Sequence, residues 1–205
     1  MVKEFIKKSF DFIAALVFLI IILPLLAVLA LLIKIDSRGP VFFRQERLGR
    51  GGKAFRIWKL RTMVENAENS GQGLASSKND PRITKIGKFL REWTLDEWPQ
   101  LINIIKGEMS LVGPRPLPRY KDQGSFLDKL WEKRLAVSPG LICLVDIKGR
   151  GLVSWEKRLE YDAWYVDNWS LLLDLKILFL GFFAVLSRRG VYGEGGTNSL
   201  PPKGK

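Results

Sequence analysis

Asp96 and Glu97 are adjacent acids at the predicted start of a helix, within the segment LREWTLDEWPQLINIIKGEMSLVGPRP at residues 90–116. The segment ends at Arg115, whose backbone freedom is limited by a proline on each side. A carboxylate can attack phosphorus and form an acyl phosphate. A guanidinium can bind a phosphate through two parallel hydrogen bonds. Together these residues indicate chemistry at a phosphate group.

The two acids should have different tasks. Neighbouring residues of a helix point about 100° apart, so one carboxylate can face the phosphorus as nucleophile while the other holds Mg²⁺. A helix start favours both an ionised carboxylate and a bound phosphate. The alternative is structural: Thr94 or Asp96 caps a helix that runs to Lys106, and Glu97 completes a capping box when Thr94 is the cap.

Other basic residues could reach the same phosphate. Arg91 precedes the acid pair on a predicted helix, where a solvated helix face explains it equally well. Lys59 and Arg61 lie in a predicted strand and could contact a phosphate or lipid headgroups, although most basic strand residues are only solvated. The sequence leaves both interpretations open for each of the three.

Composition narrows the chemistry further. The 205 residues carry a net charge of +12, which predicts an anionic partner such as lipid headgroups, nucleotide phosphates or nucleic acid. Histidine is absent from the sequence, which excludes Ser–His or Cys–His catalysis and His-ligated metals. Cys143 is the single cysteine, so no internal disulfide is possible. A metal, if used, should be a hard cation held by carboxylates and phosphate oxygens.

The elements that position these residues begin with an uncharged apolar run at 12–33, long enough to span a bilayer. It is too long for a signal peptide and no cleavage site follows it. Pro24 should bend or break this helix. Both flanks are rich in Lys and Arg, which prefer the cytoplasmic side. The pattern favours a re-entrant helix, which enters and leaves by one face, over a spanning helix with a proline kink.

The remaining elements follow from periodicity and turn residues. The apolar stretch at 171–186 contains Asp174 and Lys176 and is predicted to be an interfacial or core helix. Strands are predicted at 41–47, 55–63 and 141–147, helices at 83–93, 126–136 and 154–166, a mobile loop at 65–80, and a disordered end beyond Gly190.

With these motifs the chain resembles the small monotopic phosphoglycosyl transferases, also called bacterial sugar transferases. It is most similar to the members that initiate bacterial N-linked glycosylation. The resemblance rests on the basic-flanked apolar start and on FRIWKLRTM, LDEWPQLINIIKGEMSLVGPRP, KGRG, SWEKRLEYDAWYV and LLLDLKI. It implies an α/β fold, mostly α: a re-entrant membrane anchor at 1–35 broken at Pro24, a catalytic domain with membrane-surface helices at 36–187, and a flexible tail at 188–205. The location implied is the cytoplasmic face of the bacterial inner membrane.

The resemblance also implies a reaction. Asp96 would attack the β-phosphorus of a UDP-sugar, UMP would leave, and undecaprenyl phosphate or another polyprenol phosphate would then take the phosphosugar from the aspartyl enzyme. Mg²⁺ would be required, with Glu97 as its ligand. A homodimer is possible, and nucleic acid is not an expected partner. The family's pattern further implies phosphate contacts by Arg115 and Arg91 and site roles for Arg61 and Asp174. Lys59 is a candidate for phosphate binding from its place in the basic strand, and Arg150 is a further site candidate.

The chain departs from the family's pattern in three places. Leu23 replaces the serine before the proline at the helix break, and residues 138–143 read SPGLIC in place of RPGITG. Of the family's QVNGR only Gly149 and Arg150 remain. We expect these changes to alter nucleotide or sugar recognition and to leave the chemistry intact. The sugar itself is not fixed by any of these residues.

A competing hypothesis is a non-catalytic, membrane-anchored basic domain that binds anionic lipid or nucleic acid. It explains the charge and the anchor but not an acid pair beside Arg115. The length favours a compact enzyme over a larger transferase with regulatory domains.

Overall fold

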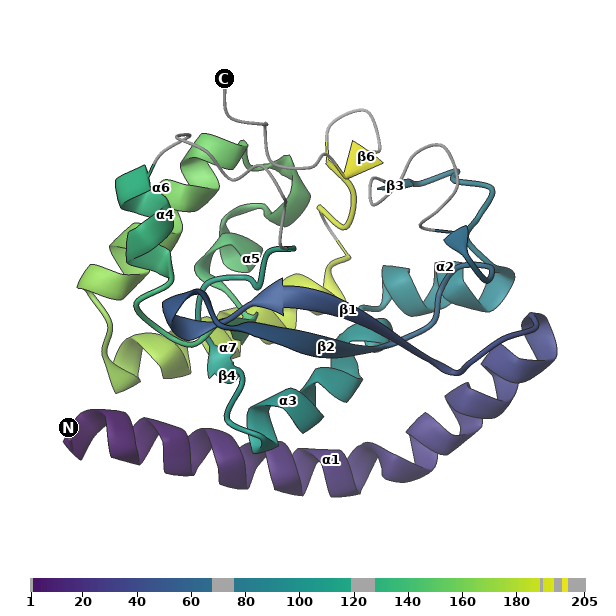
Figure 1. Ribbon diagram of the computed structural model, residues 1–205, viewed down its shortest axis with the longest axis horizontal. Helices are drawn as coiled ribbons and strands as arrows, with labels where there is room; N and C mark the ends of the chain where they lie inside the picture. Colours follow the sequence, from purple (N-terminus) through teal and green to yellow (C-terminus); the bar gives the residue numbers. More distant parts are fainter. Residues whose placement is uncertain (1, 68–75, 119–127, 189, 194–196, 199–205) are drawn as a thin grey trace.

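The structure is a computed structural model that describes residues 2–67, 76–118, 128–188, 190–193 and 197–198. It is mostly helical, with short paired strands, as the sequence predicts. In Figure 1, helix α1 (Val2–Asp36) runs along one side of the molecule, and helix α3 (Leu101–Ile105) lies between it and the hairpin of strands β1 (Phe42–Leu48) and β2 (Ala54–Leu60). The two strands of the predicted hairpin are confirmed, with Phe42 opposite Leu60.

Helix α1 is continuous across Pro24, so the predicted break is wrong in this respect. A proline inside a helix removes one hydrogen bond and can bend the axis without ending the helix, and Figure 1 shows α1 bending along its length. Within the described part of the chain, α1 is the one helix long and apolar enough to cross a membrane. Its buried residues recur at helical spacing and so form one stripe: Asp11, Ala15, Ile22, Leu26, Leu29 and Ile33.

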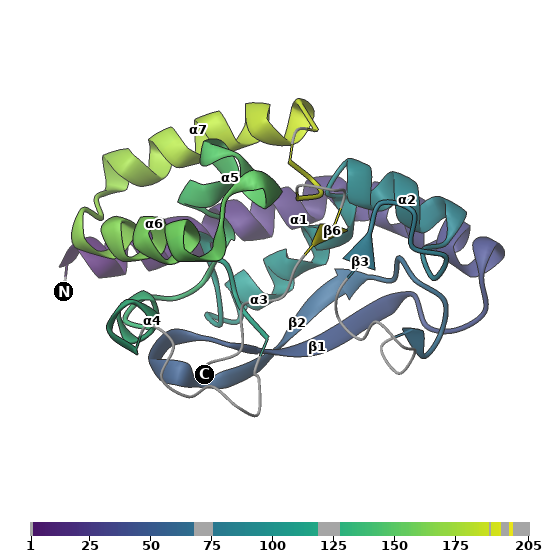
Figure 2. The same ribbon diagram turned by 90° about the horizontal axis from the view of Figure 1, so that it is seen from above.

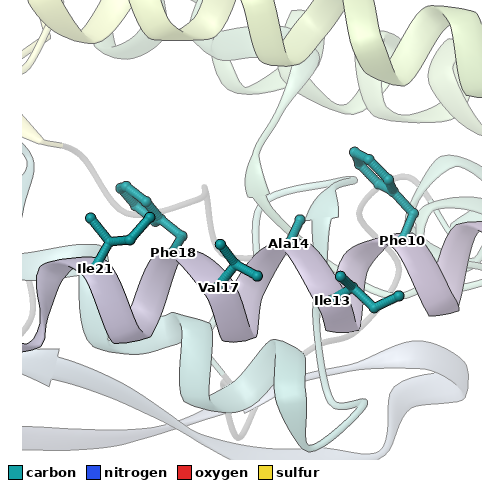
Figure 3. Close-up of a pocket in the computed structure, with 6 residues that line it drawn as sticks. All are labelled: Phe10, Ile13, Ala14, Val17, Phe18 and Ile21. Carbon is teal, nitrogen blue, oxygen red and sulfur yellow. The ribbon is translucent and has the colours of Figure 1, made fainter.

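The buried stripe of α1 joins the main core of the molecule. Phe55 and Ile57 from β2 and Leu90, Leu101 and Ile104 from the following helices pack against it. Between Phe10 and Ile33 the rest of the α1 surface is apolar and largely exposed, and part of that surface forms a shallow groove (Figure 3).

The predicted helices at 83–93, 126–136, 154–166 and 171–186 are confirmed within a few residues. Figure 2 shows α6 and α7 on the opposite side of the molecule from the β1–β2 hairpin, with α5 beside both. The remaining elements are η1 (Arg50–Gly52), β3 (Ser76–Ser77), α2 (Lys85–Glu92), η3 (Leu95–Gln100), β4 (Ser110–Val112), α4 (Asp128–Arg134), β5 (Gly140–Ile142), α5 (Leu144–Lys148), η4 (Arg150–Leu152), α6 (Trp155–Asp167), α7 (Leu171–Leu186) and β6 (Thr197–Asn198).

The strand predicted at 141–147 is only partly correct. Strand β5 ends at Ile142, and Cys143 is the N-cap of α5. Asp146 accepts a hydrogen bond from the Cys143 backbone N–H at 2.8 Å and thereby holds the first turn of the helix. A short apolar run does not by itself distinguish a strand from a buried helix.

Helix α7 is a core helix on one face, whereas an interfacial position of its other face remains a prediction. Its inward face buries Asp174, Ile177 and Gly181. Its outward face exposes large apolar side chains, namely Leu172, Leu175, Phe179, Phe182, Phe183 and Leu186. The polar stretch predicted as a loop contributes β3, which pairs with β6 from the predicted tail; residues 68–75 and most of 189–205 lie outside the described residues. The predicted boundaries at 35 and 187 remain predictions.

Candidate active site

Strand β2 and η3 bring Lys59 to the acid pair. Its Nζ lies 2.7 Å from Oε1 of Glu97 and 3.9 Å from Oδ2 of Asp96. Strand β2 is joined to α3, the helix that follows η3, by Asn103, which is fully buried. Its Oδ1 accepts from the Trp58 backbone N–H at 2.9 Å, and its Nδ2 donates to the carbonyl of Arg56 at 2.9 Å. This amide fixes the strand that carries Lys59 against the helix that follows the acids.

The acid pair does not cap a helix in either of the ways considered. The chain enters η3 through Thr94, which has a φ of 59° and makes no side-chain cap bond. Asp96 lies inside η3, which is a 3-10 turn that precedes α3. The carboxylate of Glu97 binds Lys59 and Arg115. The capping hypothesis is therefore wrong, and among the described residues neither carboxylate accepts a hydrogen bond from a backbone N–H.

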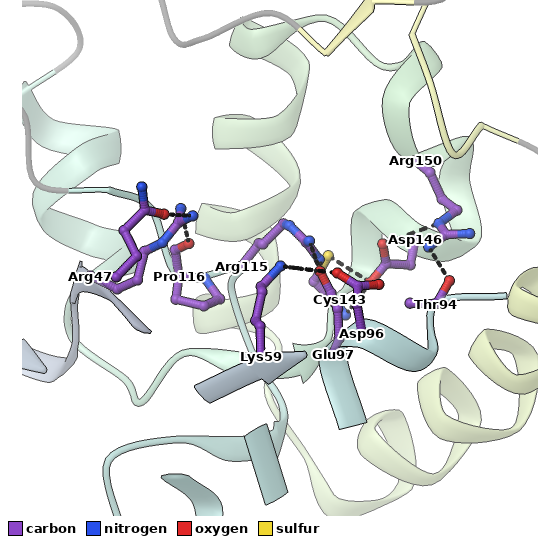
Figure 4. A network of polar contacts seen from close by, with 11 residues as sticks. Arg47, Lys59, Thr94, Asp96, Glu97, Arg115, Pro116, Cys143, Asp146 and Arg150 are labelled. Atoms are coloured by element: carbon purple, nitrogen blue, oxygen red, sulfur yellow. Dashed lines mark hydrogen bonds and ion pairs between the residues drawn. The ribbon is translucent and has the colours of Figure 1, made fainter. Parts of the chain in front are cut away.

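Arg115 faces the acid pair across the site. Its Nη2 pairs with Oε1 of Glu97, and its Nη1 lies 3.3 Å from Oε2, as Figure 4 shows. The guanidinium is thus held in a forked arrangement, while two fifths of its side chain stays exposed to solvent. An exposed guanidinium beside a buried carboxylate has donors left for an incoming anion.

A close contact of two backbones positions Arg115. Strands β4 and β5 pair in parallel, and Gly113, which follows β4, lies against Gly140 at the start of β5. A Cβ on Gly140 would lie 2.1 Å from the backbone N of Gly113, and one on Gly113 would lie 2.5 Å from the carbonyl of Ser138. Only glycine permits this approach. It sets the divergent 138–143 stretch directly beside the segment that carries Arg115.

The pKa values of the two acids are pushed apart. Burial raises the pKa of Asp96, and the nearby charge of Glu97 raises it further, against the opposing charges of Lys59, Arg91 and Arg115. Burial acts on Glu97 in the same direction, but the charges of Arg115 and Lys59 and their hydrogen bonds outweigh it. The pKa of Glu97 therefore lies well below its usual range. Glu97 is a fixed anion, and Asp96 is the carboxyl that titrates.

Asp96 and Glu97 are also the carboxylates available for a metal at this point. Among the described residues no group of three or more His, Cys, Asp or Glu side chains is arranged to hold a metal ion. Mg²⁺ is commonly bound by one or two carboxylates together with substrate phosphates. The donor set fits that mode of binding and does not fit a closed protein cage.

Comparison with known proteins identifies the family of the chain. A family model described as bacterial sugar transferase matches residues 2–188. The chain belongs to the bacterial sugar transferase family. Sugar transferase EpsL of Bacillus subtilis, described as uncharacterized, is 44% identical over 190 residues, which cover 91% of this chain and 90% of the relative.

Two longer relatives carry more specific names. A UDP-glucose:undecaprenyl-phosphate glucose-1-phosphate transferase of Klebsiella pneumoniae is 43% identical over 192 residues, and a UDP-galactose-lipid carrier transferase of Erwinia amylovora is 39% identical over 209 residues. The matches cover 91% and 93% of this chain. This sugar transferase spans only 41% and 42% of the length of these two relatives.

Two more of the predicted residues lie next to the acids of this sugar transferase. Arg91 donates from Nε to Oγ1 of Thr62 at 2.8 Å, and its charge lowers the pKa of Asp96. Arg150 donates from Nη2 to Oγ1 of Thr94 at 3.1 Å. Its Nη1 is buried and has no hydrogen-bond partner among the described residues. Figure 4 shows Arg150 on the side of the acid pair opposite Lys59.

Arg61 is placed away from the acid pair. Its guanidinium is buried at the C-terminal end of α1. It donates to the carbonyls of Arg38 at 2.5 Å, Ser37 at 2.7 Å and Ile33 at 3.3 Å. A cation there satisfies the last carbonyls of the helix and complements its dipole. The donors of Arg61 are directed at α1 and not at the phosphate site.

Asp174 is likewise remote from the acids. It lies on α7, where Oδ2 accepts from Lys7 Nζ at 2.6 Å and from Trp169 Nε1 at 3.0 Å, and Oδ1 accepts from the Tyr165 hydroxyl at 2.7 Å. Asp174 thus ties the first turns of α1 to α6 and α7. The last predicted residue, Pro24, lies within α1 and is not near the acids in sequence or in its element.

The sequence analysis missed Asn103 and the pair Cys143–Asp146. Oδ2 of Asp146 accepts from the Cys143 thiol at 3.0 Å, and burial raises the pKa of that thiol, as does the charge of Asp146. Figure 4 shows this pair beside Arg115 and the acids. An amide in the apolar run LINII and an acid where the family has glutamine were the available signals.

Proposed function

We propose that this sugar transferase moves a phosphosugar from a UDP-sugar to undecaprenyl phosphate, giving undecaprenyl-diphospho-sugar and UMP. The observation that carries the proposal is the acid pair set between Lys59 and Arg115. The names of the longer relatives support the donor and acceptor classes. The chain provides the anionic nucleophile and the surrounding cations that such a transfer between two phosphates needs.

In the proposed first step, a carboxylate oxygen of Asp96 attacks the β-phosphorus of the donor. A bond forms between that oxygen and phosphorus, and the bond from the β-phosphorus to the oxygen bridging the two phosphates breaks, so UMP leaves. A phosphate oxygen of undecaprenyl phosphate then attacks the same phosphorus and releases the carboxylate. Asp96 is the suitable nucleophile, because Glu97 is held by two cations.

Lys59, Arg115 and Arg91 have complementary tasks in this scheme. Their positive charges favour the ionised form of Asp96, and the same charges offset the negative charge on the phosphoryl oxygens during transfer. Bound Mg²⁺ would neutralise further charge on the diphosphate, and we propose Glu97 as its protein ligand. The metal requirement and the aspartyl intermediate are both parts of the proposal.

The packing of α1 supports a re-entrant placement in the membrane. Its buried stripe runs from Asp11 to Ile33, so the catalytic domain lies alongside most of the helix. A helix perpendicular to the bilayer would draw the domain into hydrocarbon, where its loops would lose hydrogen bonds to water. We therefore propose that α1 enters and leaves by one face, with the domain on the cytoplasmic side of the bacterial inner membrane, because both flanks are basic.

The test is release of UMP from a panel of UDP-sugars by the purified protein in nanodiscs with Mg²⁺ and undecaprenyl phosphate. We expect release with one donor class and a loss of at least about a thousand-fold in Asp96→Asn. The matched control is Asp167→Asn, whose carboxylate makes a surface ion pair with Lys133 and which should keep full activity. Intact-protein mass spectrometry should find a phosphosugar adduct on the wild type and none on Asp96→Asn.

Two results would contradict the proposal. One is full turnover by Asp96→Asn, which would remove the assigned nucleophile. The other is no release from any donor by folded, membrane-inserted wild type, which would favour a non-catalytic basic domain on anionic lipid.

A further inference from the structure

The chain that follows α7 folds back onto the elements that carry the active site. The guanidinium carbon of Arg188 lies 4.6 Å from the centre of the Trp93 ring, three residues before Asp96. Further along, β6 pairs with β3 in an antiparallel arrangement. Figure 1 shows this part of the chain, in yellow, running from α7 to β6. Residues 190–193 lie between these two contacts in the chain.

A close backbone contact holds residues 190–193 against the loop that carries Arg150. The backbone N–H of Gly151 donates to the carbonyl of Gly190 at 2.8 Å. Gly190 has a φ of 65°, and a Cβ there would lie 2.4 Å from the carbonyl oxygen of Gly149. Only glycine permits this approach. The same loop is tied to the entry of η3, because Arg150 donates to Oγ1 of Thr94 at 3.1 Å.

Tyr192 brings a hydroxyl from this segment to the acid pair. The hydroxyl oxygen is buried and has no hydrogen-bond partner among the described residues. Burial raises the pKa of this hydroxyl, the charge of Arg91 opposes that shift, and the charges of Glu92 and Asp96 raise the pKa further. The hydroxyl therefore lies within electrostatic reach of all three side chains, and it is protonated at neutral pH.

A buried hydroxyl without a hydrogen-bond partner destabilises a fold, and its presence calls for an explanation such as a catalytic role. Arg150 has a second donor of this kind, because its Nη1 is also buried without a partner among the described residues. The two donors belong to segments that the bond between Gly151 and Gly190 joins. Phosphate oxygens are strong acceptors, and in the proposed reaction the β-phosphate of the donor must come to Asp96.

We propose that Tyr192 binds the UDP-sugar, with its hydroxyl donating a hydrogen bond to a β-phosphate oxygen while Asp96 attacks that phosphorus. The proposal rests on the proposed function for the identity of the donor. Side-chain rotations on ligand binding are common, and hydrogen bonds to a substrate often tighten only in the complex. The hydroxyl, covered in the unliganded protein, turns to the phosphate when the donor binds. The segment after α7 is thereby part of the active site.

The test removes the hydroxyl and keeps the ring. We expect Tyr192→Phe to raise the Kd for UDP with Mg²⁺ about tenfold or more, the effect of one hydrogen bond to a charged group. The Kd for UMP, which has no β-phosphate, should not change. Both are measured by isothermal titration of the protein in detergent. The midpoint of unfolding should stay the same or rise, because the substitution removes a buried oxygen that has no partner.

The matched control is Tyr165→Phe. The Tyr165 hydroxyl donates to Oδ1 of Asp174 at 2.7 Å, remote from the acids. Its loss should lower the midpoint of unfolding and leave both Kd values unchanged, which is the result expected of a tyrosine with a purely structural role. A second variant, Gly190→Val, should weaken UDP as Tyr192→Phe does, because its side chain cannot fit against Gly149 and must displace the segment.

Unchanged affinity for UDP in folded Tyr192→Phe would overturn the proposal and leave Tyr192 a packing residue. Equal weakening of UDP and UMP would also overturn it, since the contact would then be with the nucleoside or the α-phosphate. Unchanged affinity in Gly190→Val would contradict the positioning of Tyr192 by the segment. UDP binding that depends on Tyr192, without turnover of any UDP-sugar, would instead refute the proposed function and keep the Tyr192 contact.

Discussion

Lys59 donates from Nζ to Oε1 of Glu97 at 2.7 Å, and this bond joins strand β2 to η3 beside the titrating acid. The same nitrogen lies 3.9 Å from Oδ2 of Asp96. One cation therefore acts on both carboxylates. Burial raises the pKa of each acid, and Lys59 opposes that shift in both. For Glu97 the opposing charges are dominant, whereas for Asp96 burial is dominant.

We expect Lys59→Met to move the acid limb of the pH–activity profile to higher pH. Asp96 must be ionised to attack, and loss of the lysine charge raises its pKa further. Lys59 acts on Asp96 by charge alone, across 3.9 Å between Nζ and Oδ2, and removing that charge should shift the limb by about one pH unit. The measurement is kcat/KM as a function of pH, over about two units on each side of neutrality. Lys133→Met, which removes a surface ion pair with Asp167, is the control and should leave the profile in place.

An unchanged acid limb in Lys59→Met would mean that Asp96 does not set it. A uniform fall in rate at every pH would instead assign Lys59 to the transferred phosphate alone.

Arg61→Met should destabilise the protein and leave donor binding unaffected. The buried guanidinium satisfies carbonyls at the end of α1, so its removal leaves them without a donor. We expect a loss of about 1.5–3 kcal/mol in the free energy of unfolding, measured by denaturant titration in detergent. Arg56→Met, an exposed neighbour on β2, is the control. A raised KM for the UDP-sugar without loss of stability would show that Arg61 binds phosphate after all.

Asp174→Asn should also act through stability. The carboxylate is buried against Lys7, Tyr165 and Trp169, and neutralising it leaves Asp11, 3.6 Å from Lys7 Nζ, as the remaining counter-charge of that lysine. Losing the charged hydrogen bond should cost about 1.5–3 kcal/mol. Asp167→Asn, in its exposed pair with Lys133, should cost no more than about 1 kcal/mol. If Asp174→Asn kept its stability but lost turnover, a direct role of Asp174 in the reaction would be indicated.

Ser138→Arg should change the choice of donor and spare the chemistry. The carbonyl of Ser138 lies against Gly113, next to the segment of Arg115, so a new guanidinium there would enter the donor side of the site. We expect the ranking of UDP-sugars by kcat/KM to change by about tenfold for at least one donor, the effect of one good polar contact. Ala136→Arg, on the exposed surface nearby, is the control. An unchanged ranking would show that this stretch does not contact the donor.

The sequence by itself determined the local elements and the chemical types of the site. The apolar run of α1, the hairpin at 42–60 and the helices at 85–92, 155–167 and 171–186 follow from local composition and periodicity. Which residues of α1 form its buried stripe does not follow from the sequence, because the run is apolar on every side. The adjacency of Asp96 and Glu97 and the prolines around Arg115 are covalent facts that no fold can change. Helix α5 escaped prediction because the apolar run that contains it is short and starts with a true strand, β5.

Only the tertiary structure decided which basic residues contact the acid pair. Lys59 and Arg61 are two residues apart, and strand alternation would point both toward one face. Strand β2 ends at Leu60, however, so alternation stops before Arg61. Lys59 therefore reaches Glu97, whereas Arg61 turns to the carbonyls of α1. Such partners come from segments distant in sequence, and their meeting depends on packing, which local patterns do not encode.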